Sequence, residues 1–308
     1  MARKRKYNPK GFAHIYQRGY RMSVLFYSVK DILVFYTILH ILKKKYDITI
    51  VELVCMYNHY HMLLKSDNQE TVSRFMCEFE TIYAKEFNKD IGAEGHVFQP
   101  NYGLSNKIGD KKKRDSCAYL ANNPVEKGLA VKAEDYRWNF LAYAVSDHPF
   151  SKKLVVRNAS TKMKKVLAEV KYLQSNVRYV NYTFLRKWFS VLKNDEINQL
   201  IDYIIVKYKV LDYDEAIHLY GSFDSMLIAV NSNTGSEHDI KEDYSDRSYM
   251  PYVSLIRSLS REYGFVNPKE VLRLSPEDRR RLCEVLIREK HVTRFIAETL
   301  LHIHTYQK

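Results

Sequence analysis

The sequence lacks the long apolar run that a membrane-spanning helix requires. Such a helix needs roughly 18 or more consecutive apolar residues. The best candidate, residues 32–42, is interrupted by polar side chains and bounded by Asp31 and Lys43. The basic first residues are not followed by the apolar stretch of a signal peptide, because Tyr7-Asn-Pro-Lys10 comes next. We therefore expect a cytoplasmic chain that is neither membrane-bound nor secreted.

Cysteine is also scarce, with 4 residues in 308. The four lie far apart, with neither the spacing of a disulfide framework nor that of a metal site: Cys55, Cys77, Cys117 and Cys283. This usage is typical of proteins in a reducing compartment.

Positive charge is abundant instead. The 49 basic and 36 acidic residues give a net charge of +13. Residues 1–46 alone hold 11 Lys or Arg and 1 acid, Asp31, a local balance of 11 − 1 = +10. A second cluster is Lys111-Lys-Lys-Arg114. Such density favours a polyanionic partner, most often nucleic acid, although it could also be only a solubilising surface.

A length of 308 residues suggests two domains, and the character of the chain changes near residue 150. Before it, β-rich segments alternate with amphipathic helices, which predicts an antiparallel sheet with helices on one face. The expected strands are 12–16, 23–27, 48–56, 59–64 and a last one within 129–145. The expected helices are 31–46, capped by Asp31, then 71–88 and 112–122, the last ending before Pro124. Residues 92–109 should be a loop.

Residues 151–308 should be mainly helical. Helical patterns cover 182–192, 196–210, 213–219, 250–263, 276–289 and 292–301, and the polar stretch 231–248 resembles a linker. We therefore expect one domain at 1–150 and a helical region at 151–308.

One candidate site is the segment Met56-Tyr-Asn-His-Tyr-His61. On a strand, residues i and i+2 point to the same face, so His59 and His61 project together. Imidazole is the commonest transition-metal ligand, but histidines with a purely structural role are also common on sheets. The pair alone leaves both interpretations open.

A second candidate site is the segment Tyr119-Leu-Ala-Asn-Asn-Pro-Val125. On a helix, Tyr119 and Asn123 share a face, which pairs a possible covalent nucleophile with an amide oxygen that could bind a metal. Tyr119 is one of 25 tyrosines, and Asn123 could simply end the helix before Pro124.

Together these segments resemble a known family. A His-hydrophobic-His strand followed by the Tyr119–Val125 segment is similar to the HUH-endonuclease single-tyrosine transposases, and among them to the REP-associated tyrosine transposases of bacteria. The resemblance covers roughly residues 10–146 and includes His14-Ile-Tyr-Gln-Arg-Gly19, Asn58-His-Tyr-His-Met-Leu-Leu64 and Gly95-His-Val-Phe-Gln99. The chain departs from the family pattern at Tyr60, in the hydrophobic slot, and at Tyr57, where proline is frequent.

The resemblance implies a ferredoxin-like (RRM-like) α+β catalytic domain. It also implies a transposase that cuts and rejoins single-stranded, hairpin-containing DNA through a covalent 5′-phosphotyrosine. By position, Tyr119 would be the nucleophile, and His59, His61 and Asn123 would bind Mg²⁺ or Mn²⁺. Such a protein would be bacterial and nucleoid-associated, and either a monomer or a homodimer.

The chemistry explains why these residue types are needed. A phosphodiester is anionic and resists attack by a phenolate, so a divalent cation on a non-bridging oxygen assists the reaction. Histidine ligation alone would equally suit Zn²⁺. A tyrosine has a pKa near 10 and needs nearby positive charge to react at neutral pH. The metal and the run Lys111–Arg114 could both supply it.

The expected DNA contacts are basic side chains from both clusters: Arg3, Lys4, Arg5, Lys6, Arg18, Lys111, Lys112, Lys113 and Arg114. The first four could equally form a tail without contacts. Residues of about 276–303 form a possible helix-turn-helix, similar to one appended to relatives of these transposases, or else a plain helical hairpin. Two other functions stay open, a non-catalytic DNA-binding regulator on the same scaffold and a replication or relaxase-type nickase.

Overall fold

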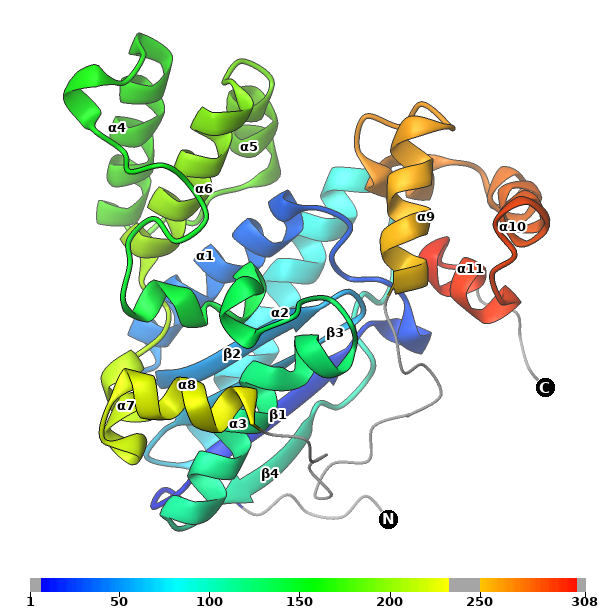
Figure 1. The fold of residues 1–308 in the computed structure, drawn as a ribbon. Helices are drawn as coiled ribbons and strands as arrows, with labels where there is room; N and C mark the ends of the chain where they lie inside the picture. Colours follow the sequence, from blue (N-terminus) through cyan, green and yellow to red (C-terminus); the bar gives the residue numbers. More distant parts are fainter. Residues whose placement is uncertain (1–6, 233–249, 304–308) are drawn as a thin grey trace, which may run out of the picture.

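A four-stranded antiparallel sheet forms the centre of the molecule (Figure 1). The structure is a computed structural model that describes residues 7–232 and 250–303. The strand order is β2-β3-β1-β4, with bounds β1 Phe12–Arg18, β2 Thr49–Met56, β3 His59–Lys65 and β4 Gly103–Lys107. The chain runs β-α-β-β-α-β, the succession of the ferredoxin-like fold, which confirms the expected α+β class.

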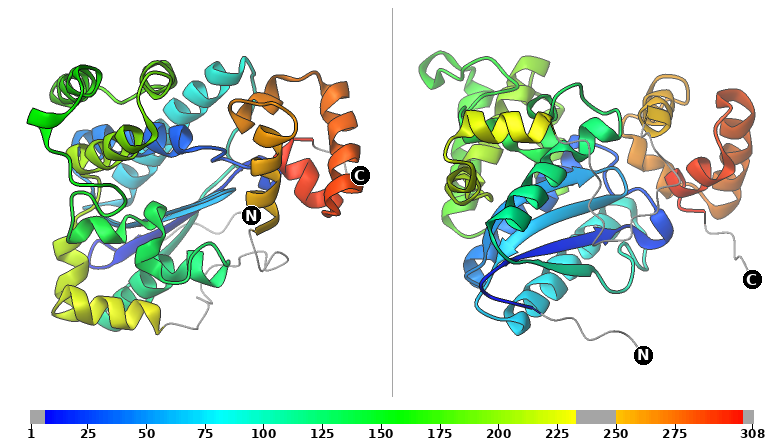
Figure 2. Two further views of the ribbon diagram at one scale, coloured as in Figure 1. Left: turned by 45° about the horizontal axis from the view of Figure 1, so that its top comes forward. Right: turned by 60° about the horizontal axis from the view of Figure 1, so that its bottom comes forward.

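Helices lie on both faces of this sheet (Figure 2). Helix α1 (Val29–Lys45) and helix α2 (Gln69–Ile91) pack on one face, where the ring of Phe35 lies 4.8 Å from that of Tyr60 on β3 and 4.8 Å from that of Phe79 on α2. Helix α3 (Asp110–Glu126) crosses the opposite face and contacts β2, β3 and β4. The two faces therefore have different helical neighbours.

The second half of the described chain is helical, as predicted. Its helices are α4 Thr161–Ser175, α5 Tyr182–Phe189, α6 Asn194–Tyr208, α7 Tyr213–Tyr220, α8 Phe223–Asn231, α9 Met250–Arg261, α10 Pro276–Lys290 and α11 Arg294–Leu300. Short 3-10 helices complete the chain: η1 Tyr20–Met22, η2 Ala133–Asp135, η3 Arg137–Asn139, η4 Leu141–Ala144, η5 Val156–Asn158 and η6 Pro268–Arg273. Helices α4 and α8 were not predicted.

These later helices pack against the sheet domain. Helix α6 packs on α1, while α7 and α8 both pack on α3, and α7 also contacts β2. Tyr220 donates a hydrogen bond of 2.5 Å to the carbonyl of Arg114, and Asn139 donates one of 3.0 Å to that of Ala121. Helix α3 is therefore held between the sheet and the helical region.

Two expected strands are wrong. Residues 23–27 are irregular because the amides of Leu25 and Phe26 both donate to one carbonyl, that of Tyr57, which is incompatible with a strand ladder. Residues 129–145 form 3-10 turns, and Phe140 has φ 61°, a left-handed conformation that interrupts an extended run. The fourth strand is β4, inside the segment that was expected to be a loop.

Two helix ends also differ from the prediction. Helix α3 continues through Pro124 to Glu126. Proline inside a helix removes one hydrogen bond and its ring clashes with the preceding turn, but residues 116–124 are all buried, and their packing holds the helix together. Helix α1 begins after Ser28, and Asp31 lies one turn inside, where it accepts a hydrogen bond of 2.8 Å from the Ser28 amide.

Within the described ranges, no helix combines the length and the apolar character needed to cross a bilayer. The N-terminal candidates Arg3, Lys4, Arg5 and Lys6 lie outside the described residues, and so does most of the expected linker 231–248.

Candidate active site

The histidine pair lies on the face of the sheet that α3 covers. Alternation along β3 puts His59 and His61 on one face, and the ladder sets His61 opposite Tyr16 and His59 opposite Arg18. The two imidazole centroids are 5.0 Å apart and their planes nearly perpendicular. His59 is 4% exposed and His61 fully buried.

Each imidazole is oriented through its Nδ1 atom. Nδ1 of His59 lies 2.9 Å from Oδ1 of Asn58, and Nδ1 of His61 lies 3.0 Å from Nε2 of His14 on β1. An amide oxygen only accepts, so the Asn58 contact puts the proton on Nδ1 of His59. Nε2 of His59 then carries no proton and could bind a cation. Nε2 of His61 could do the same if Nδ1 of His61 donates a hydrogen bond to His14.

The electrostatic surroundings keep His59 neutral. Burial lowers the pKa of His59 well below its usual value, and the positive charges of Lys127 and Arg18, with His61 beside it, lower the pKa further. A neutral imidazole is the form that binds a metal, so no proton has to be removed from His59 at neutral pH.

Helix α3 brings Tyr119 and Asn123 to the same place. The ring of Tyr119 meets that of His61 edge-on, with 6.0 Å between centroids. Nδ2 of Asn123 donates a hydrogen bond of 3.4 Å to the Tyr119 hydroxyl, as the i, i+4 spacing predicts. The four residues singled out from the sequence thus gather within one chain. The Tyr119 ring is also well covered, with 3% of its surface exposed.

The residues fit a divalent cation in one specific respect. The Oδ1 atom of Asn123 is buried and has no hydrogen-bond partner among the described residues. A buried amide oxygen of this kind is costly unless something binds to it. The described chain contains no group of three or more His, Cys, Asp or Glu side chains placed to hold a metal. A cation at this place would therefore depend on the Asn123 oxygen to complement the two imidazoles.

The positively charged candidates lie at two different places. Arg18 ends β1 beside His59, and its guanidinium contacts the sulfur of Met22. Lys111, Lys112, Lys113 and Arg114 form the first turns of α3, where Lys113 lies over the ring of Phe12, at the other end of β1. The structure therefore does not bring this run to the histidine pair.

Two residues near the site were not identified from the sequence as functional. His14 contacts His61, and the strand register that pairs β1 with β3 was not available from spacing alone. Lys127 follows Asn123 by four residues, so the helical spacing that selected Tyr119 and Asn123 could have found it.

Comparison with known proteins supports a family assignment. Residues 12–123 match the family model described as "Transposase IS200 like". One solved structure, of a REP-associated tyrosine transposase bound to a REP hairpin, matches with 15% identity over 50% of this chain and 94% of that chain, at a TM-score of 0.40. No curated protein matches this sequence. The matched residues include His59, His61, Tyr119 and Asn123, so residues 12–123 are similar to the IS200-like transposase family.

Proposed function

We propose that this protein is a transposase that cuts and rejoins single-stranded, hairpin-containing DNA through a covalent bond between Tyr119 and a 5′-phosphate. The observation that carries the proposal is that Tyr119, Asn123 and His61 meet within one chain. The Tyr119 hydroxyl accepts a hydrogen bond from Asn123, and the Tyr119 ring packs edge-on against the ring of His61. These contacts join a nucleophile with possible metal ligands, as phosphoryl transfer to a tyrosine requires.

In the proposed reaction, the Tyr119 oxygen attacks the phosphorus and the bond to the 3′ oxygen breaks. The phenolic proton leaves Tyr119, and the departing 3′ oxygen takes up a proton, so the products are a phosphotyrosine and a free 3′-hydroxyl. One phosphate ester replaces another of similar energy. A 3′-hydroxyl can therefore reverse the step and rejoin DNA without ATP.

His59, His61 and Asn123 are the residues that would hold a divalent cation such as Mg²⁺ or Mn²⁺. When bound, the cation would neutralise charge on a non-bridging phosphate oxygen. The positive charges of Arg18 and Lys127, which act on His59, lie where they would also favour the anionic phenolate and the phosphate. His14 and Asn58 would keep the two imidazoles oriented.

The burial of Tyr119 favours a second candidate function. A side chain with 3% exposure is accessible to a phosphodiester only after neighbouring chain moves. If that opening never occurs, the protein is a non-catalytic DNA-binding regulator on a transposase scaffold. The same observation favours a flexible, single-stranded substrate over a rigid duplex, because a single strand can enter a narrow opening.

Trapping of the covalent intermediate separates the two candidates. Hairpin oligonucleotides with single-stranded flanks, labelled at the 3′ end and incubated with Mn²⁺, should leave label on the denatured wild-type protein. Tyr119→Phe should abolish the labelled band. Tyr60→Phe is the matched control, because Tyr60 is also buried but lies on the opposite face of β3 with its hydroxyl unbonded.

The outcomes have different meanings. Label lost in Tyr119→Phe and kept in Tyr60→Phe supports the covalent mechanism. Binding of hairpin DNA without any labelled wild-type protein, over a panel of hairpins, would favour the regulator.

A further inference from the structure

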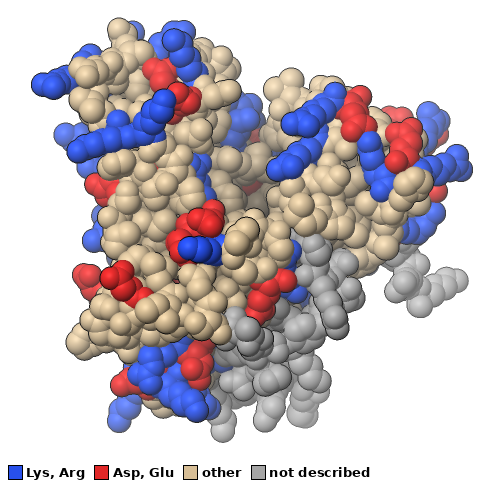
Figure 3. Space-filling model, in the orientation of Figure 1, with Lys and Arg blue, Asp and Glu red and all other residues tan. Residues whose placement is uncertain are grey.

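A second polar site lies away from the histidines, where three parts of the chain meet. The first turn of α1, the end of α2, helix α5 and the 3-10 helix η6 surround a pocket of about 280 Å³. Figure 3 shows a hollow between the lobe of α4–α6 and the lobe of α9–α11, with Lys and Arg side chains on both sides. Four cationic side chains line the pocket: Lys30, Arg186, Lys269 and Arg273.

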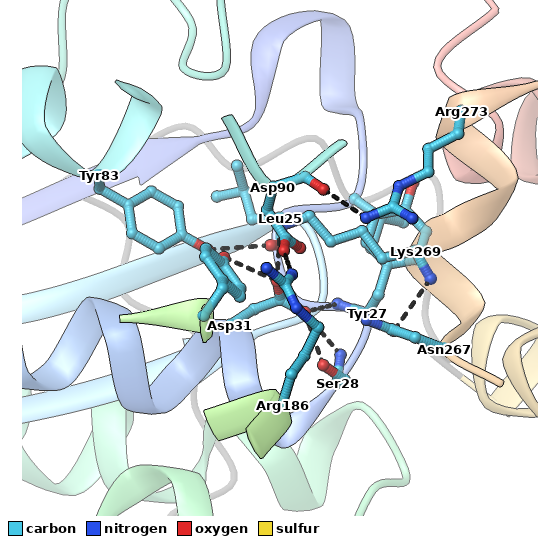
Figure 4. Close-up of polar contacts among 12 residues, drawn as sticks. Leu25, Tyr27, Ser28, Asp31, Tyr83, Asp90, Arg186, Asn267, Lys269 and Arg273 are labelled. Atoms are coloured by element: carbon cyan, nitrogen blue, oxygen red, sulfur yellow. Dashed lines mark hydrogen bonds and ion pairs between the residues drawn. The ribbon is translucent and has the colours of Figure 1, made fainter. Parts of the chain in front are cut away.

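The inner layer of this cluster is neutralised within the protein (Figure 4). Lys269 is 1% exposed, and its Nζ lies 3.0 Å from Asp31 and 3.2 Å from Asp90. Arg186 forms an ion pair with Asp90 as well. Two cations and two carboxylates thus balance one another, and Arg273 donates a hydrogen bond of 2.7 Å to the carbonyl of Asp90.

The outer layer of the cluster is not balanced. Lys30 is half-buried and forms no ion pair with any described residue, and its Nζ lies 5.9 Å from the centre of the Phe189 ring. The charges that act on Lys30 are the carboxylates of Asp31 and Glu270 and the cations of Arg186 and Lys269. Glu270 is the remaining carboxylate, and it accepts a hydrogen bond of 3.4 Å from the Asn267 amide. Four cations against Asp31, Asp90 and Glu270 give 4 − 3 = +1. A half-buried cation that forms no ion pair is unfavourable, and an anion in the pocket would stabilise it.

We propose that this pocket binds a phosphodiester group of the DNA strand that leads away from the active site. The proposal rests on the proposed function and extends it to the path of the substrate. A phosphodiester carries one negative charge, which matches the excess of +1. Phe189 and Val266 at the pocket, the latter 90% exposed, offer apolar surface to a deoxyribose.

The position of the pocket fits a continuous strand. The residues just before α1 run along the turn that precedes His59, since the amides of Leu25 and Phe26 donate to the carbonyl of Tyr57 at 2.7 and 3.0 Å. Lys30 follows in the first turn of α1. The pocket therefore lies toward the end of the sheet at which β3 and its histidines begin, but on the α1 and α2 face, opposite the histidines. A strand from the active site would reach the pocket by turning around this end of the sheet.

Replacement of Lys30 tests the proposal without touching the histidine site. Lys30→Met removes the unbalanced charge and keeps most of the side-chain volume. Lys171→Met is the matched control, because Lys171 is exposed on α4 and does not line the pocket. Without ligand, Lys30→Met should unfold at the same temperature as the wild type or a higher one, because the half-buried charge is gone. Lys30→Gln serves as a second variant if the methionine does not fold.

Two measurements report on the ligand. The first is the rise in unfolding temperature when inorganic phosphate replaces chloride at constant ionic strength. The second is binding of a fluorescent single-stranded oligonucleotide, without divalent cation, over a range of salt concentrations. Lys30→Met should lose the phosphate effect and bind DNA about tenfold more weakly, and the slope of log K against log salt should fall by about 0.7.

Each outcome decides the matter. If Lys30→Met binds DNA as Lys171→Met does, with the same salt slope, the phosphodiester proposal is wrong. If, in addition, inorganic phosphate stabilises Lys171→Met but no longer stabilises Lys30→Met, the pocket binds free phosphate instead. Binding is measured without covalent chemistry. Failure of the Tyr119 mechanism therefore leaves this test intact.

Discussion

The two faces of the sheet are built from the same strands but serve different purposes. On the face toward α1 and α2, Tyr60 packs against Phe35 and Phe79, ring against ring. On the face toward α3, the same two strands carry His14 and His61, whose imidazole nitrogens contact each other. Apolar burial on the first face stabilises the fold, whereas buried imidazoles on the second contribute little stability and require partners.

The polar face extends beyond the histidines. Glu52 on β2 lies across from Leu63, which in turn lies across from His14, so all three share this face. Burial raises the pKa of Glu52 well above its usual value, because the charged carboxylate is poorly solvated there. Polar groups buried at such a cost are typical of functional sites, and the comparison of the two faces can be tested by mutation.

The largest effect is expected on the polar face, at His61. Loss of a metal ligand removes several kcal/mol of transition-state stabilisation, so His61→Ala should slow covalent adduct formation by a factor on the order of 1000. DNA binding should stay close to that of the wild type, and a chelator should have the same effect on the wild-type protein. His148→Ala, away from the site, is the control. An unchanged adduct yield in His61→Ala would refute the ligand assignment.

The next effect is expected on the apolar face, at Phe35. This ring is fully buried between β3 and α2, and Phe35→Ala should lower the free energy of unfolding by about 3–5 kcal/mol. Urea unfolding measures it, with Phe295→Ala as control because Phe295 is 43% exposed on α11. Adduct formation per folded molecule should not change. A selective loss of activity in Phe35→Ala would contradict the division between the faces.

A smaller effect is expected where His14 orients His61. His14→Phe keeps a ring but removes the nitrogen beside Nδ1 of His61, and such a loss weakens metal binding by about 10–100-fold. Calorimetric titration with Mn²⁺, without DNA, measures this affinity. His14→Gln should recover part of it, because its amide oxygen can accept the same bond. Equal Mn²⁺ affinity in all three proteins would show that His14 has no positioning role.

The smallest effect concerns a histidine outside the site. His40 on α1 is 5% exposed, and burial lowers its pKa to about 4. In the unfolded chain His40 takes up its proton near pH 6.5. Its contribution to the free energy of unfolding is therefore fully present above that pH and is lost as the pH falls toward 4. Between about pH 7 and about pH 5.5 the loss should be about 1 kcal/mol. His40→Leu should remove that part of the pH dependence in urea unfolding, and an unaltered dependence would mean that His40 is not its source.

Elements with strong periodicity were predictable, and those without it were not. Helix α2 was expected at 71–88 because its apolar residues recur on one face, and the structure confirms it with ends a few residues longer. Strand β4 was missed because it is a short edge strand, Gly103-Leu-Ser-Asn-Lys107, with one large apolar residue and no alternating pattern. The run 129–145 was mistaken for a strand because a left-handed Phe140 cannot be read from composition.

The same distinction holds for the candidate site. Spacing along the chain determined that His59 and His61 share one strand face and that Tyr119 and Asn123 share one helix face, because strand and helix periods are local properties of the backbone. Only the tertiary structure decided that these two faces meet, that His14 and Lys127 join them, and that Lys30 lies at a pocket built by distant helices. Such meetings depend on how strands pair and helices pack over long stretches of chain, which no local pattern encodes.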